Sequence, residues 1–231
     1  MYKEVTNTLN SSWKNHSILR HLFEDEMEYL EGMSEIRHYK KNEIIFHQGK
    51  SISGCYIVLS GIVKQYKTSV EGRNYILRLA KPFEILGYRS ALSEEPACNT
   101  SSVIEESFVY FIPNDCLLHL VKTNGTFALE LLQIACLEME ESHLLITEIA
   151  QKSVKERLAE LILTLKNKFG VNEKGQLNIL LSREEYANIV GTATESVIRL
   201  LSEFKAERYI DISGKTIAIL NEKALTKLAS M

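Results

Sequence analysis

Two charged side chains, Glu195 and Arg199, are four residues apart in the segment Thr-Glu-Ser-Val-Ile-Arg. Residues at this spacing are neighbours on one face of a helix, and Thr194 and Ile198 fall on the same side. An arginine fork donates two parallel hydrogen bonds, a carboxylate accepts them, and isoleucine offers an apolar contact. This combination of side chains is suited to recognising a flat edge that carries hydrogen-bonding groups.

The surrounding residues predict two short helices that would hold this face in place. Ser182 followed by Glu185, and Thr192 followed by Glu195, each fit a capping box, in which side chains satisfy backbone N–H groups of the first turn. Gly191 lies between them and can adopt a turn that larger residues resist. The second helix has an apolar face formed by Val197, Leu200, Leu201 and Phe204. A docked helix with a short polar face fits the major groove of DNA.

The whole string from residue 181 to residue 201 resembles the helix-turn-helix of the Crp/Fnr family of bacterial transcription regulators. Residues 209–220 resemble that family's wing, with two short alternating strands around a Ser-Gly-Lys turn. The resemblance implies that the polar face of the second helix contacts bases. It also implies phosphate contacts that position this helix, from Ser182, Arg183, Thr192, Ser196 and Lys215.

Two positions on the base-contacting face depart from the family pattern. Thr194 stands where the cyclic-AMP-responsive members carry an arginine, and Ile198 is larger than the small residue often found at its position. Arg199 can bind guanine, Glu195 can accept from cytosine, and Ile198 can contact a thymine methyl group. We therefore expect a half-site that differs from that of the cyclic-AMP-responsive branch.

Composition and charge narrow the class of protein. The chain has 231 residues, of which 45% are hydrophobic and 25% charged, as in a globular protein with room for two domains. No apolar run is long enough to span a membrane and the N-terminus lacks a signal-peptide core, so we expect a cytoplasmic protein. No metal-ligand, nucleophile or phosphate-loop spacing appears, which argues against an enzyme. The cysteines are scattered and are expected to be reduced: Cys55, Cys98, Cys116 and Cys136.

Charge is distributed unevenly along the chain. Residues 152–231 hold 13 Lys and Arg against 10 Asp and Glu, whereas residues 1–151 hold 14 against 20. A basic C-terminal third after an acidic body fits DNA contact confined to one end of the molecule.

In the first half of the chain, the spacing of apolar residues changes from a helical period to a period of two. Residues 15–38 have a helical pattern, and the residues after them alternate with a period of two between regularly spaced glycines. Residues 70–73 form a good hairpin turn between strands over 64–68 and 74–79. Phe46-His47-Gln48-Gly49 and the string from Tyr56 to Gly61 resemble the cyclic-nucleotide-binding β-roll of the same family. The residues expected in strands are Ile44, Phe46, Tyr56, Val58, Val63, Ile76, Leu77, Leu79, Val109 and Phe111.

A long helix is expected over residues 126–150, because no proline or glycine interrupts them. Alternating steps of three and four residues define a coiled-coil seam: Ala128, Leu132, Ala135, Met139, Ser142, Ile146 and Ile149. We expect this seam to join two chains in a parallel homodimer, although it could instead pack on its own β-roll. Apolar residues outside the seam are expected to cover that roll: Leu131, Ile134, Leu137, Leu144 and Leu145.

The predicted fold class is therefore α+β. It combines an N-terminal antiparallel β-roll of the double-stranded β-helix or jelly-roll type, a long dimerisation helix and a C-terminal winged helix-turn-helix. The predicted boundaries are 1–125 for the sensor domain, 126–152 for the helix with its hinge, and 153–231 for the DNA-binding domain. Residues 152–154 are the expected hinge, and a further helix is expected over 155–169.

The predicted effector loop lacks groups that cyclic AMP requires. In the family members that bind this nucleotide, a Gly-Glu-Leu motif holds the ribose, and an arginine about ten residues later neutralises the phosphate. Here Gly87 matches, but Tyr88 replaces the acid, and Cys98, Asn99 or Thr100 replaces the arginine. A buried phosphate without a cation would carry an uncompensated charge. We therefore expect no cyclic AMP binding in the known mode.

The identity of any effector stays open. Arg89 could pair with a different anion or could simply be a solvated surface arginine. Haem is conceivable, with His143 as the first histidine to consider, whereas the absence of cysteine from residues 1–54 excludes the N-terminal iron–sulfur cluster of the family. The candidate pocket residues are Gly87, Tyr88, Arg89, Asn99, Thr100 and His143.

Two functional classes follow from these observations. The first is a homodimeric regulator that binds a palindromic operator in double-stranded DNA and acts with RNA polymerase. The second is a regulatory or ligand-sensing module, for example for haem, that controls a protein partner. The helix-turn-helix and the wing favour the first class.

Overall fold

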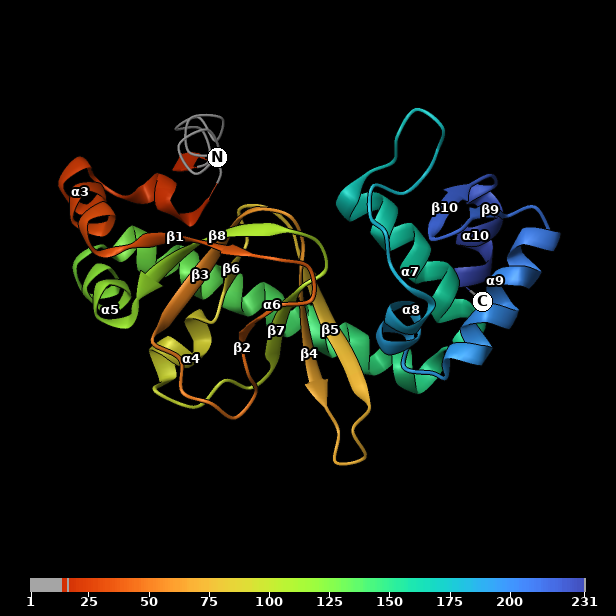
Figure 1. Ribbon diagram of the computed structural model, residues 1–231, viewed down its shortest axis with the longest axis horizontal. Helices are drawn as coiled ribbons and strands as arrows, with labels where there is room; N and C mark the ends of the chain where they lie inside the picture. Colours follow the sequence, from red (N-terminus) through yellow and green to blue (C-terminus); the bar gives the residue numbers. More distant parts are fainter. Residues whose placement is uncertain (1–13, 16, 231) are drawn as a thin grey trace. The chain divides into compact units, whose positions relative to one another are not determined.

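The computed structural model describes residues 14–15 and 17–230 of the chain (Figure 1). By its internal contacts the chain divides into two compact units, and the division falls within one long helix. The first unit comprises residues 1–68 and 77–140, and the second comprises residues 69–76 and 141–231.

The first unit is built around two antiparallel four-stranded sheets. Their strand orders are β1-β8-β3-β6 and β2-β7-β4-β5, so strands distant in sequence lie side by side, as in a jelly roll. The bounds are β1 (Glu35–Tyr39), β2 (Ile44–Phe46), β3 (Gly54–Ser60), β4 (Val63–Thr68), β5 (Asn74–Ala80), β6 (Ile85–Leu86), β7 (Thr100–Val103) and β8 (Ser107–Pro113). All ten residues expected in strands lie in them, and the expected turn over 70–73 joins β4 to β5.

Strand β3 shows how the period of two builds two separate cores. Tyr56 and Val58 point into the core between the sheets, together with Phe46, Val63, Val103 and Val109. Cys55, Ile57 and Leu59 point to the opposite face and pack against helices. A strand buried on both faces has no polar side, which explains the nearly continuous apolar run from Cys55 to Leu59.

Gly61 follows β3 and fixes the turn into β4. Its φ of 82° is left-handed, and an added Cβ would lie 2.1 Å from Oγ of Ser107. Any larger residue would therefore clash with β8 in addition to adopting an unfavourable backbone conformation.

Helices cover the outer face of the first sheet. They are the 3₁₀ helix η1 (Ile18–His21), α3 (Glu24–Met33), α4 (Tyr88–Ser93), α5 (Asn114–Thr123) and the first part of α6 (Gly125–Gln151). Leu30 of α3, Leu117 and Leu120 of α5, and Phe127 and Leu131 of α6 are all buried in this layer. The helix expected over 126–150 is thus confirmed, whereas α4 and α5 were not foreseen.

Two sequence-based expectations for the β-roll and the helix that covers it are wrong. Helical structure does not continue to residue 38, because residues 35–39 form β1, which pairs with the edge of β8. Leu137 and Leu144 do not cover the β-roll: they are exposed on α6. Leu131 and Ile134 do pack on the core, so only one narrow stripe of the helix faces it.

The second unit is a small helical domain with a two-stranded ribbon. Its elements are α7 (Val154–Phe169), α8 (Arg183–Val190), α9 (Thr194–Ala206), β9 (Ile210–Ser213), β10 (Thr216–Ile219) and α10 (Glu222–Ala229). Only Lys152 and Ser153 separate α6 from α7. The hinge expected at residues 152–154 stays a prediction, and the two compact units divide between residues 140 and 141. Oγ of Ser153 accepts a hydrogen bond from N of Glu156 at 3.3 Å and caps α7, a signal that sequence inspection missed. Leu158, Ile162, Tyr186, Val197, Leu201, Phe204, Ile210 and Ile217 are buried in this unit.

Candidate functional site

Helix α8 begins and ends as its sequence predicts. The amide of Glu185 donates to Oγ of Ser182 at 3.1 Å, and the amide of Ser182 donates to Oε2 of Glu185 at 2.8 Å. Both halves of the capping box are therefore formed. Gly191 ends the helix with a φ of 73°, and its amide donates to the carbonyl of Ala187 at 2.9 Å. This left-handed residue turns the chain toward α9.

The predicted second capping box, Thr192 with Glu195, is wrong. Helix α9 begins at Thr194, its N-cap is Ala193, and no side chain caps it. The amide of Thr192 instead donates to the carbonyl of Ala187 and continues the turn after Gly191. Because the helix starts one residue later than predicted, Glu195 is at the second helical position. A capping-box acid must be at the third position to reach back to the N-cap amide.

This late start leaves the side chain of Glu195 available for another partner. Glu195, Ile198 and Arg199 are exposed on one face of α9, while Val197, Leu200, Leu201 and Phe204 are buried beneath it. Ile198 is 49% exposed, so its apolar side chain is open to contact from outside the domain. Within the described residues, neither Glu195 nor Arg199 makes a hydrogen bond or an ion pair.

Side chains from two helices bind the backbone of the wing, and Leu177 and Gly175 bond its second strand through their own backbone. Strand β9 pairs with β10 through the register Ser213↔Thr216. Nη2 of Arg183, at the start of α8, donates to the carbonyl of Gly214 at 2.8 Å. Nζ of Lys205, near the end of α9, donates to the carbonyl of Ile212 at 2.8 Å and lies 3.0 Å from Oδ1 of Asp211.

The five residues expected to contact phosphates lie in three places. Ser182 and Arg183 are at the start of α8, Thr192 and Ser196 are at or just before the first turn of α9, and Lys215 is in the wing. Lys215 is exposed at the wing turn, and Ser196 is half-buried in the first turn of α9. The hydroxyl of Ser182 already serves as a cap, and Arg183 already binds Gly214. Thr194, expected to face bases, is only half-buried and stays accessible at the first position of α9.

The predicted effector loop forms α4, and the hydroxyl of its Tyr88 is already paired. Tyr88 is 2% exposed, and its hydroxyl donates to Oε2 of Glu138 on α6 at 3.0 Å. Arg78 of β5 pairs with the same carboxylate and also donates to Oε2 of Glu84 at 2.8 Å. Burial, followed by the charge of Glu138, raises the pKa of Tyr88, so this phenol stays protonated at neutral pH.

We call Arg78, Glu84, Tyr88 and Glu138 the inner network. All three of its charged side chains are at most 21% exposed. Sequence inspection found Tyr88 but missed the other three. Arg78 and Glu138 are far apart in sequence, so no spacing pattern could reveal that they meet.

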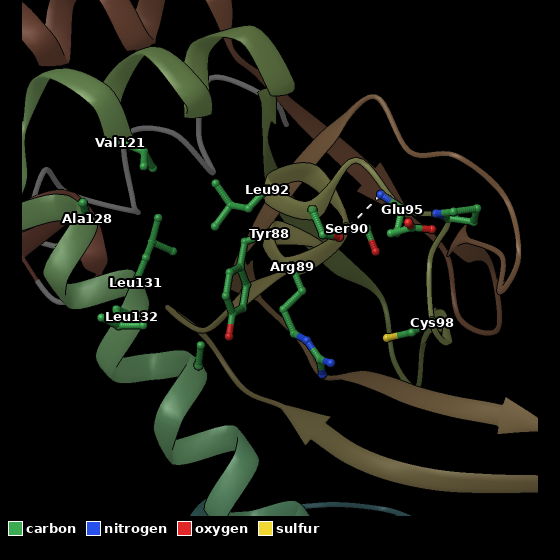
Figure 2. A pocket seen from close by; sticks show the side chains of 13 residues that line it. Tyr88, Arg89, Ser90, Leu92, Glu95, Cys98, Val121, Ala128, Leu131 and Leu132 are labelled. Carbon is green, nitrogen blue, oxygen red and sulfur yellow. Dashed lines mark hydrogen bonds between the residues drawn. The ribbon is translucent and has the colours of Figure 1, made fainter.

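A cavity of about 560 Å³ lies beside the inner network, between α4 and α6. Figure 2 shows Tyr88 and Arg89 of α4 on one side of it and Leu131 and Leu132 of α6 on the other. Arg89 is exposed and makes no hydrogen bond or ion pair with the described residues.

The remaining predicted pocket residues have other roles. Gly87 is the N-cap of α4, Oδ1 of Asn99 accepts from Gln65, and Oγ1 of Thr100 accepts from the amide of Gln48. His143 is exposed on α6 and does not line the cavity. The structure thus brings Tyr88 and Arg89 together at the cavity, but it does not bring Gly87, Asn99, Thr100 or His143 to its walls.

The expected seam of α6 is largely uncovered in the single chain. Leu132, Met139 and Ile146 are 60%, 57% and 65% exposed. Ala135 packs partly against the β-roll core, and Ser142 and Ile149 are exposed.

Two known domain families match this chain in the order that the structure shows. Residues 36–124 match the cyclic nucleotide-binding domain, and residues 156–228 match the Crp-like helix-turn-helix domain. The chain belongs to the Crp/Fnr family of transcription regulators. Regulators of this family bind DNA and act as dimers.

Relatives of this Crp/Fnr regulator include proteins with different named roles. It is 24% identical over 193 residues to the CRP-like cAMP-activated global transcriptional regulator of Mycobacterium tuberculosis, covering 83% of this chain and 86% of that protein. It is 27% identical over 209 residues to the transcriptional activator protein Anr of Pseudomonas protegens, covering 88% and 85%.

Solved structures of the family share its fold. FixK2 from Bradyrhizobium japonicum aligns with a TM-score of 0.77 at 21% identity, over 84% of this chain and 96% of that one. A family regulator from Thermus thermophilus aligns with a TM-score of 0.71 at 24% identity, over 85% and 99%. Among the described residues, no helix is long and apolar enough to cross a membrane.

Proposed function

We propose that this Crp/Fnr regulator acts as a homodimer that binds a palindromic operator through α9 of each copy, and that it does so without cyclic AMP. The observation that carries this proposal is the exposed face formed by Glu195, Ile198 and Arg199, whose two charged groups have no partner among the described residues. The DNA-bound protein is expected to act in the cytoplasm and together with RNA polymerase.

The chemistry of this face suggests which bases it reads. Arg199 can donate to O6 and N7 of one guanine, and Glu195 can accept from N4 of a cytosine. Ile198 can contact a thymine methyl group, because its side chain is exposed on the same face. Thr194 adds a hydroxyl at the start of the helix. Ser182, Arg183, Thr192, Ser196 and Lys215 are proposed to anchor the domain on phosphates or to support that anchoring.

The inner network supports the proposal that cyclic AMP is not the effector. Two carboxylates, from Glu84 and Glu138, share one guanidinium, from Arg78, so this group is net negative. The only cation of the network is already shared between these carboxylates, so it is not free to neutralise a phosphate, and Arg89 lies outside the network. The hydroxyl of Tyr88 also replaces the carboxylate that would accept from a ribose, and this hydroxyl is already engaged with Glu138.

The exposed seam of α6 supports the homodimer. Large apolar side chains at Leu132, Met139 and Ile146 recur every seven residues, and a second copy of the same helix would bury them. Two-fold symmetry would then place two copies of α9 about one turn of DNA apart, which matches a palindromic operator.

Two measurements test this proposal. Fluorescence anisotropy at physiological salt should show saturable binding to the DNA upstream of the coding sequence. Unrelated DNA of equal length should bind with lower affinity. Equal affinity for both DNAs would refute sequence-specific binding. Calorimetry with cyclic AMP should show no binding at micromolar concentrations, and DNA affinity should be the same with and without the nucleotide. Micromolar binding would refute cyclic AMP independence but leave the DNA-binding proposal standing.

A further inference from the structure

Arg183 occupies the first position of α8, yet its guanidinium is directed to the wing. Nη2 donates to the carbonyl of Gly214 at 2.8 Å, although the two residues are 31 positions apart in the sequence. Gly214 forms the turn between β9 and β10, directly before Lys215. The bond therefore connects the start of the helix-turn-helix to the tip of the wing.

The other terminal nitrogen of Arg183 is shielded from solvent. Nη1 is buried and has no hydrogen-bond partner among the described residues. Tyr186, one turn further along α8, is fully buried, and burial raises its pKa while the charge of Arg183 acts in the opposite direction. A phosphate oxygen outside the protein could not reach Nη1 unless the side chain moved. The arginine is therefore built into the domain and is not extended toward a ligand.

We infer that Arg183 is a positioning residue that sets the wing turn, and through it Lys215, relative to the recognition helix. This inference rests on the proposed phosphate contact of Lys215. It replaces a direct phosphate contact by Arg183 itself. A two-stranded ribbon is only marginally stable alone, so its tip needs support from the rest of the domain. The rest of the ribbon is held elsewhere: Nζ of Lys205 bonds the carbonyl of Ile212, and β10 makes backbone hydrogen bonds to Gly175 and Leu177. Among these contacts, that of Arg183 is the one at the turn itself.

A double-mutant cycle distinguishes positioning from direct contact. Arg183→Met and Lys215→Ala are measured singly and together for affinity to the operator, with Lys223→Ala on the exposed face of α10 as the control. Each single change should weaken binding by roughly three- to tenfold, as loss of one phosphate contact does. The operator affinity of the double variant should be within about twofold of that of the weaker-binding single variant, because both changes remove the same contact.

Hydrogen exchange on the free protein provides the second measurement. Arg183→Met should accelerate amide exchange in residues 210–219, while the thermal midpoint stays close to that of the wild type. Lys215→Ala should leave exchange in this segment unchanged.

The inference is overturned if the effects of the two changes on affinity multiply, or if exchange in the wing is the same in Arg183→Met and wild type. Because the exchange measurement needs no DNA, it separates failure of this inference from failure of the DNA-binding proposal. In the latter case the wild type would not discriminate the operator, whatever the state of its wing.

Discussion

The inner network of the β-roll and the exposed face of α9 contain the same kinds of side chain but use them differently. In the network, Arg78, Glu138 and Tyr88 satisfy one another below the surface. On α9, Glu195 and Arg199 are also a carboxylate and a guanidinium, one helical turn apart, yet they make no bond to each other or to any described residue.

The difference shows which polar groups a ligand can use. A buried ion pair has already exchanged its water for protein partners, so a ligand would have to break it at a net cost. An exposed, unpaired group loses only water when it binds, and it gains specificity from the direction of its hydrogen bonds. The family resemblance covers both regions, but the inner network has already used its polar groups, whereas those of Glu195 and Arg199 on α9 stay available for a ligand.

The largest expected effect is a loss of dimerisation through α6, the helix that lies between the β-roll and the α9 domain in the sequence. Ile146→Glu should abolish the dimer at micromolar concentration, because two like charges would be buried in one seam at a cost of several kcal/mol. Operator affinity should fall with it, since one recognition helix cannot hold a two-fold site. Sedimentation at equal concentration measures the change, with Leu144→Glu as an exposed control outside the seam. If the wild type were a monomer, or if Leu144→Glu dissociated the dimer as much as Ile146→Glu, the proposal that this seam joins two chains would be wrong.

The next largest effect tests whether the exposed face of α9, with Glu195, Ile198 and Arg199, contacts the bases. Arg199→Ala should remove about 1–3 kcal/mol of operator binding and relax the preference at one base pair, because a bidentate guanine contact is lost. Anisotropy against a set of single-base operator variants measures both. Lys223→Ala should change neither. Unchanged affinity and unchanged base preference in Arg199→Ala would show that this side chain does not face the bases.

A third change tests whether the inner network is structural. Arg78→Met leaves the carboxylates of Glu84 and Glu138 without their shared cation, so the free energy of unfolding should fall by about 1–2 kcal/mol. Urea denaturation measures it. Arg73→Met is the matched control, because Arg73 is 85% exposed and its ion pair with Glu71 should contribute less than about 0.5 kcal/mol. Equal stability of the two variants would mean that the network is not a stabilising feature.

The smallest expected effect is a pH dependence in the same network. The pKa of Tyr88 is raised in the folded chain, whereas an unfolded tyrosine titrates near about 10. Above that pH the folded state binds more protons than the unfolded state, so this contribution to stability is complete below about pH 9 and declines as pH rises.

Tyr88→Phe removes both the hydroxyl and its titration. The variant should be about 0.5–1.5 kcal/mol less stable than wild type at pH 7, and the gap should narrow between about pH 9 and 11. Urea titrations across this range measure the gap. A gap that stays constant with pH would show that the environment of Tyr88 does not favour its neutral form.

Much of the DNA-binding half could be predicted because its signals are local. The capping box of Ser182 with Glu185 and the left-handed turn at Gly191 each depend on residues within four positions of one another, and both formed as expected. The second capping box failed by one residue, because Ala193, and not Thr192, became the N-cap. The same sequence fits both starts, so the packing of α9 on the domain core decides between them.

The sequence alone determined the helix-turn-helix, the wing, the long helix and the identity of the groups on α9, since periodicity and capping act over a few residues. Only the tertiary structure decided that residues 35–39 form a strand on the edge of β8, that Arg78 meets Glu138, and that Arg183 binds Gly214. Each of these contacts joins segments that are distant in sequence. Their geometry depends on how sheets and helices pack, and no local pattern records that packing.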